Sequence, residues 1–294
     1  RKAFKITNGN QTSVDAADYV EIGYKIEAQD IANSGWNYTS TSSFITIQFW
    51  AKSSVAQTFY GYMFNRDGTI TAYPFSYALS ENTWTKVTKT IPGNSALTFN
   101  NDNGSGLEIY LPLFMGTNLT DNSRSLESWA TLGDGSAHTP DQTSTWYETD
   151  DATFEITGFQ LEVGSQATAF EHRSFGEEIS LCLRYYEKTY PYGVALGGSA
   201  SYTGYVSTCG SSNATGSMVV PIYFAEKRTS PTITAYNAVN GDSGTWHVQR
   251  NGATGHNSVT IDQISTQRAR LYFSTGANWV VANAEGHFEA NAEL

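Results

Sequence analysis

The sequence predicts an all-β protein built from two domains. Only 15% of the residues are charged and 14% are aromatic, and Thr, Ser, Asn and Gly are frequent, which is typical of strands joined by polar turns. Short segments alternate apolar and polar residues with the period of two that a strand with one buried face requires. With 294 residues, the chain is long enough to bury two separate cores.

The first domain is expected over residues 1–171. Residues 44–51 and 57–64 alternate as strands do, and the turn residues at 65–68 predict that the second of these forms a hairpin with the strand after it. Further strands are expected at 84–91, 107–113 and 153–163, the last with an irregularity at Gly158. Antiparallel strands without a helical period between them favour a two-sheet sandwich.

The second domain, residues 172–294, is expected to begin with a helix. Ser174 and Glu177 fit a capping box, and Pro191 and Gly193 are expected to end the helix. This helix is apolar on two faces, so a neighbouring subunit is a candidate cover for the second face. The residues expected at that contact are Ile179, Leu181 and Tyr185. The strands expected after the helix are 202–208, 216–224, 232–238, 245–250, 258–264, 268–274, 279–284 and the final nine residues, with Pro221 placing its strand at an edge or a bulge.

Charge and apolar content exclude two classes of partner. A net charge of −11 argues against nucleic acid, which needs a clustered basic surface. No apolar run approaches the roughly 20 residues of a membrane span. Cys182 and Cys209 are too few for a disulfide framework and are expected to be reduced. The first residues are expected to continue a longer chain, and Leu294 is expected to be the natural C-terminus.

One stretch resembles a known family. The run from Phe154 to Lys188 contains FQLEVGS, then ATAFEHRSFGEE, then CLRYYEK. It is similar to a stretch of bacteriophage tail-fibre and tail-tip proteins whose usual wording is close to QLEVG, ATPFEHR, GEEL and CxRYY. The chain departs from it at Ala169, where proline is frequent, and at Leu183, where glutamine is frequent. The resemblance implies a homotrimeric receptor-binding part of a phage tail, assembled in the host cytoplasm beside other virion proteins.

A second resemblance concerns the first domain. The segments IEAQDI, FITIQFWAKSS, WTKVTKTIPG and FEITGFQLE look like the strand order of carbohydrate-binding jelly-roll modules. This resemblance implies an N-terminal jelly roll, and it implies that Asp150 and Asp151 are candidates for a structural Ca²⁺ site, because such modules often hold calcium through carboxylate and backbone oxygens. The C-terminal domain is then expected to be a β-rich tip or trimerisation domain.

No catalytic signature is recognised in the sequence. The GxSxG and HExxH motifs and a glycine-rich phosphate loop are absent. A hairpin turned at 251–252 can bring His247 and His256 together as a metal pair, but no further ligand completes a tetrahedral metal set. The acids at 148–151 are ordinary turn residues, with the paired carboxylates of a depolymerase as the alternative.

Aromatic residues are the strongest sign of function. Sugars present C–H faces to aromatic rings, so outward rings on the strands, and rings in or next to the long polar segment between Leu113 and Trp146, are candidates for binding carbohydrate. These residues are Trp50, Tyr60, Tyr62, Trp129, Trp146 and Tyr147, and those in or beside the long segment are expected to be exposed. For each residue on a strand, burial in the core is the alternative.

The expected function is non-catalytic attachment to host-cell surface polysaccharide. Three alternatives remain open at this stage. They are a polysaccharide depolymerase tailspike, a purely structural virion protein, and a carbohydrate-binding module of a secreted bacterial enzyme.

Overall fold

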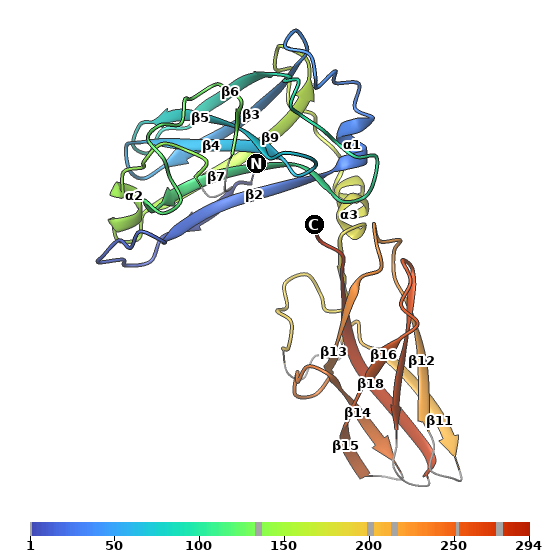
Figure 1. The fold of residues 1–294 in the computed structure, drawn as a ribbon. Helices are drawn as coiled ribbons and strands as arrows, with labels where there is room; N and C mark the ends of the chain where they lie inside the picture. Colours follow the sequence, from blue (N-terminus) through green and yellow to red (C-terminus); the bar gives the residue numbers. More distant parts are fainter. Residues whose placement is uncertain (1, 133–136, 199–202, 213–216, 251–252, 275–278) are drawn as a thin grey trace. The chain divides into compact units, whose positions relative to one another are not determined.

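The structure, a computed structural model, describes residues 2–132, 137–198, 203–212, 217–250, 253–274 and 279–294 (Figure 1). The chain divides into two compact units, Arg1–His172 with Leu294, and Arg173–Glu293. Both consist mainly of antiparallel strands, which confirms the predicted all-β class. Among the described residues, no helix is both long and apolar enough to cross a membrane.

The first unit is a sandwich of two antiparallel sheets (Figure 1). In hydrogen-bonded order, the four-stranded sheet consists of β1 (Phe4–Thr7), β9 (Thr153–Val163), β3 (Phe44–Ser53) and β6 (Thr85–Pro92). The five-stranded sheet consists of β2 (Tyr19–Glu27), β7 (Ser105–Met115), β4 (Gln57–Asn65), β5 (Thr71–Leu79) and β8 (Ala130–Thr131). Two short helices, α1 (Ala28–Ala32) and α2 (Thr145–Glu148), lie between strands in the sequence.

The main core of the first unit lies between the two sheets. Ile45, Ile47 and Phe49 of β3 face inward with Phe59 and Met63 of β4. The alternation in both segments predicts these faces, and the hairpin of β4 with β5 is confirmed. Alternate residues of β4 therefore point to the outer face of the five-stranded sheet.

A second, smaller apolar cluster covers that outer face. It joins Tyr62 and Phe64 of β4 to Met115 and to Leu132, with Leu119 packed against it. Leu119 and Leu132 belong to the long polar segment after β7, so this segment folds back over the sheet. The outer face of β4 is therefore largely covered, although the period of two alone predicts a solvent-facing row.

The irregularity expected in β9 is confirmed. Gly158 adopts a φ of +63°, a backbone conformation that favours glycine. The register between β3 and β9 shifts between Gln48 and Trp50, opposite this glycine. The bulge keeps Phe154 and Ile156 in the core while the rest of the strand continues to pair.

The second unit is also a pair of packed sheets. One contains β10 (Tyr186–Lys188), β11 (Val206–Ser212), β13 (Thr232–Asn237), β14 (Thr245–Arg250), β15 (Ala253–Ser258) and β18 (Trp279–Asn291). The other contains β12 (Ser217–Tyr223), β17 (Arg268–Ser274) and β16 (Thr260–Asp262), with Pro221 on an edge strand as predicted. Their shared core includes Val220, Trp246, Leu271 and Phe288. The last two predicted strands form one strand, β18, although the sequence suggests two.

The helix at the start of the second unit is shorter than predicted. Helix α3 (Phe175–Leu183) begins with the expected capping box, in which Ser174 accepts from the Glu177 amide and Glu177 accepts from the Ser174 amide. It ends well before Pro191, because Tyr186–Lys188 pairs with β18 instead. Long-range strand pairing thus replaces the last turns that the local pattern suggests.

Candidate functional site

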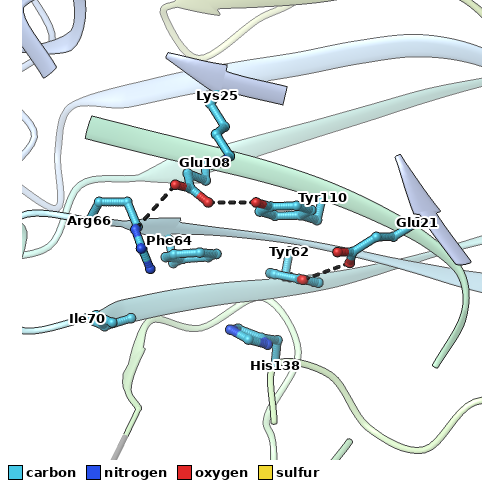
Figure 2. Close-up of a pocket in the computed structure, with 9 residues that line it drawn as sticks. All are labelled: Glu21, Lys25, Tyr62, Phe64, Arg66, Ile70, Glu108, Tyr110 and His138. Carbon is cyan, nitrogen blue, oxygen red and sulfur yellow. Dashed lines mark hydrogen bonds and ion pairs between the residues drawn. The ribbon is translucent and has the colours of Figure 1, made fainter. Parts of the chain in front are cut away.

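A pocket of about 280 Å³ opens on the outer face of the five-stranded sheet. It combines aromatic rings with two acidic and two basic side chains (Figure 2). The residues that line it are Glu21, Lys25, Tyr62, Phe64, Arg66, Ile70, Glu108, Tyr110 and His138. Such a mixture of ring faces and convergent polar groups is typical of a small-molecule site.

Strand register explains why these side chains meet. Tyr110 of β7 lies between Gly23 of β2 and Tyr62 of β4. A Cβ on Gly23 would lie 2.7 Å from Cε1 of Tyr110, so only glycine leaves room for this ring in its present position. The next row of the same face places Glu108 between Lys25 and Phe64. Six of the nine lining residues therefore lie on three adjacent strands, and Arg66, Ile70 and His138 come from segments outside them.

Stacked rings form the floor of the pocket. The rings of Tyr62 and Tyr110 have centroids 5.2 Å apart and are inclined by 17°, and those of Phe64 and Tyr110 are 5.9 Å apart and inclined by 6°. His138, from the long segment after β7, stacks on Tyr62 at 4.4 Å. Tyr62 and Phe64 are buried and Tyr110 is half-buried, so Tyr110 offers more ring surface to a ligand than either of them.

Both carboxylates of the pocket are bound by tyrosine hydroxyls. Tyr62 Oη donates to Glu21 Oε2 at 3.0 Å, and Tyr110 Oη donates to Glu108 Oε2 at 2.7 Å. Glu108 Oε1 also accepts from Ser105 Oγ at 2.8 Å and lies 3.3 Å from Arg66 Nε. These bonds fix the position of Tyr110 and of the Arg66 guanidinium (Figure 2).

Burial changes the acid–base properties of these groups. Desolvation raises the pKa of Glu21, the hydrogen bond from Tyr62 lowers it, and the neighbouring Glu108 carboxylate raises it, with a net upward direction. Desolvation also raises the pKa of Tyr62 and of Tyr110, and the carboxylates that accept from them add to the effect. Both tyrosines are therefore neutral hydrogen-bond donors at ordinary pH.

Two of the strand residues expected to bind carbohydrate lie outside the pocket. Trp50 is 41% exposed on the outer face of the other sheet, with its neighbour Lys52 held 5.2 Å over the Trp84 ring. Tyr60 is half-buried on the same face as Tyr62 but does not line the pocket. Of the predicted residues, only Tyr62 lies in the pocket wall.

The predicted exposure of the rings near the long segment is wrong for Trp146 and Tyr147. Both lie on α2, which packs into the main core, where Trp146 is fully buried and Tyr147 stacks on Phe114 at 4.6 Å. Trp129 is half-buried beside Tyr73, and its Nε1 donates to the Pro92 carbonyl oxygen at 2.6 Å. These three rings stabilise the fold around the long segment.

The predicted polar sites lie elsewhere. Asp150 and Asp151 are exposed in the turn before β9, and the calcium site stays a prediction. His247 and His256 do face each other across β14 and β15, with ring centroids 5.9 Å apart. Within the described ranges, however, no group of three His, Cys, Asp or Glu side chains is arranged to hold a metal ion. Both cysteines are free and exposed.

The sequence interpretation missed most of the pocket. Glu21, Arg66, Glu108 and His138 come from distant parts of the chain, and no local motif joins them. One signal was present in β7, where Glu108 and Tyr110 take the outward positions of a strand whose inward positions are Leu107, Ile109 and Leu111. A carboxylate in so apolar a strand indicates a polar partner on the outer face.

No protein-family model matches the sequence, and no curated protein sequence matches it. Among solved structures, the chain shows 13% identity and a TM-score of 0.26 to "Family 16 Carbohydrate Binding Module-2", covering 54% of this chain and 74% of that one. The chain also shows 8% identity and a TM-score of 0.21 to recombinant discoidin II of Dictyostelium discoideum. This match covers 96% of this chain and 79% of that one.

A third similarity is to a chain of the T13 IBDV viral particle, with 9% identity and a TM-score of 0.27 over 99% of this chain and 37% of that one. TM-scores of this size do not establish a common fold, and none of the similarities bears on the resemblance to phage tail fibres. The assignment of function therefore depends on the pocket itself.

Proposed function

We propose that the chain is a non-catalytic glycan-binding module and that the pocket on the five-stranded sheet holds the sugar. The observation that carries this proposal is the half-buried Tyr110 ring, fixed by Glu108 and flanked by charged side chains that converge on one small space. A pyranose stacks its C–H face on such a ring while its hydroxyls reach the polar rim.

The rigidity of the pocket supports binding. Tyr110 is held by a hydrogen bond and by ring stacking, and Glu108 is held by three side chains. Side chains that are already fixed lose little conformational entropy when a ligand binds. A larger share of the contact energy then contributes to affinity. Both oxygens of the Glu108 carboxylate already accept hydrogen bonds, so Glu108 is better suited to positioning Tyr110 and Arg66 than to transferring a proton.

The finer proposal is that this module belongs to a bacteriophage tail fibre and attaches it to host-surface polysaccharide. The resemblance of residues 154–188 to tail-fibre proteins supports it. A homotrimer is part of this proposal, because the α3 residues are not buried within the second unit, with Phe175 77% and Leu181 50% exposed. Three weak sites on one particle would bind with useful avidity.

Binding to a glycan array tests the coarser proposal. We expect the full chain to bind a restricted set of bacterial surface polysaccharides, and Tyr110→Ala to lose at least about tenfold in affinity, as expected for one stacked aromatic ring. Trp50→Ala, which removes an exposed ring from the other sheet, is the matched control and should bind normally. Loss of binding in Trp50→Ala but not in Tyr110→Ala would move the site to the four-stranded sheet.

Two further measurements address the finer proposal. Prolonged incubation with a bound polysaccharide should release no new reducing ends, and their appearance would favour a depolymerase. Sedimentation equilibrium should give three times the chain mass of 32.2 kDa. A monomer at micromolar concentration would contradict the trimer and leave the glycan pocket as a separate question.

A further inference from the structure

Arg66 occupies one end of the pocket in an unusual way. It follows β4 directly. Its amide donates to the Gly106 carbonyl oxygen at 2.8 Å, which fixes its backbone to β7 two residues before Glu108. Its side chain is 50% exposed, and its guanidinium carbon lies 5.8 Å from the Phe64 ring centre. The guanidinium thus lies against the Phe64 ring and remains open to solvent.

Only one edge of this guanidinium is used by the protein. Nε lies 3.3 Å from Glu108 Oε1, whereas within the described part of the chain neither Nη atom makes a hydrogen bond to another residue. A guanidinium carries five N–H donors in a planar fork. Its terminal edge is therefore held in place and available to a ligand.

The other charged side chains of the pocket already have partners of their own. Lys25 is opposite Glu108 in the β2–β7 register, but its Nζ donates to the Leu294 carbonyl oxygen at 3.0 Å, whereas Arg66 Nε lies 3.3 Å from Glu108 Oε1. Both oxygens of the Glu108 carboxylate already accept hydrogen bonds from Ser105 and Tyr110. The second acid, Glu21, is bound to Tyr62, and Tyr62 lies in the neighbouring row of the sheet.

We propose that the pocket selects sugars that carry a carboxylate, such as uronic or sialic acids, and that Arg66 binds this carboxylate through its two Nη atoms. The planar fork matches a carboxylate in a bidentate arrangement, which neither a hydroxyl nor an ammonium ligand can reproduce. The sugar ring then lies toward Tyr110, on the floor described above. This inference rests on the proposed function, because it names the ligand class of the same pocket.

Carboxyl reduction of the ligand provides the test. The probes are bacterial capsular polysaccharides that contain glucuronic, galacturonic or sialic acid, each compared with its own carboxyl-reduced form, in which the acid becomes a primary alcohol. We expect the full chain to bind at least one acidic form about 10- to 100-fold more tightly than its reduced form, as one charge-assisted pair of hydrogen bonds provides.

Variants of Arg66 assign the preference to this residue. Arg66→Gln should abolish the preference for the acidic form while retaining the weak binding of the reduced form. Arg66→Lys keeps the charge without the planar fork and should recover only part of the preference. Arg173→Gln removes the same charge from an exposed position in the second unit and should behave as the unmodified chain does. Near-ultraviolet circular dichroism of the aromatic cluster shows whether each variant keeps its fold.

The outcomes separate this inference from the proposed function. Equal binding of the acidic and reduced forms would overturn the inference and leave glycan binding standing. A preference for acidic sugars that survives in Arg66→Gln would also overturn it, because the carboxylate would then bind elsewhere. Failure to bind any probe in either form would count against both.

Discussion

Single residues determine the shape of the pocket, and Gly23 is the clearest case. Gly23→Ala brings a Cβ to 2.7 Å from Tyr110, so the ring must move and its bond to Glu108 is strained. We expect a loss of stability of about 1–3 kcal/mol, as for other overpacked sites, and weaker glycan binding. Urea unfolding and the binding assay above measure these effects.

The control for this substitution is Gly176→Ala. Gly176 lies in α3, and a Cβ there would meet nothing within 4 Å. Alanine has the higher helix propensity, so this variant should be neutral or slightly more stable, with normal binding. If Gly23→Ala behaved in the same way, Tyr110 would not be held as described.

Glu21 gives the first unit a pH dependence with a defined sign. Because the pKa of Glu21 is raised in the fold, its contribution to stability is fully present below the unfolded pKa, near 4.5, and is lost as pH rises through the higher folded pKa. Glu21→Gln removes the penalty for burying the charge. Its melting temperature should therefore exceed that of the unmodified chain at pH 7 and equal it at pH 4.

The matched control is Glu81→Gln, which replaces an exposed carboxyl away from the pocket. It should change the melting temperature at neither pH. A Glu21→Gln variant that is less stable than the unmodified chain at pH 7 would show that the carboxylate is needed in its ionised form, contrary to the effect of desolvation.

At the scale of elements, α3 depends on its cap. None of its described residues is buried, so packing contributes little and the capping box carries much of its stability. Ser174→Ala should cost about 1 kcal/mol and should accelerate amide exchange in the first turn of α3 about fivefold. Ser180→Ala, which removes a hydroxyl bonded to the Gly176 carbonyl oxygen inside the helix, should leave exchange unchanged. Equal protection in both variants would show that contacts other than the cap hold the helix.

Elements with a clear local period could be predicted from the sequence. The inward face of β3, the β4–β5 hairpin and the irregularity in β9 follow from alternation, turn residues and glycine chemistry. The helix cap could also be predicted, because it depends on residues that are close in the sequence. The strand Tyr186–Lys188 could not be predicted, because its pairing with β18 joins residues about a hundred positions apart and overrides the helical pattern.

The candidate site was less predictable for the same physical reason. The outward direction of Tyr62 was correct, but its burial comes from His138 and Leu132, which the chain brings back over the sheet. Trp146 was expected in an exposed loop and is instead a core residue, because α2 folds it between the sheets. Pockets built from separate strands depend on register, which a single sequence specifies only indirectly.

For the whole molecule, two separate cores predict two unfolding transitions. Ile47 and Leu271 are both fully buried, one in each core. Replacing either by alanine should cost about 2–5 kcal/mol. In calorimetry, Ile47→Ala should lower only the transition of the first unit and Leu271→Ala only that of the second. A single transition that both variants shift would show that the two units unfold together.

The central claim is that the outer face of the five-stranded sheet is the glycan-binding surface. Hydrogen–deuterium exchange of the intact chain, with and without the tightest-binding polysaccharide of the array, tests it most directly. The account predicts new protection in β4 and β7, around Tyr62–Arg66 and Glu108–Tyr110, and unchanged exchange around Trp50. Protection confined to β3 and β6, or to Arg173–Glu293, would contradict it.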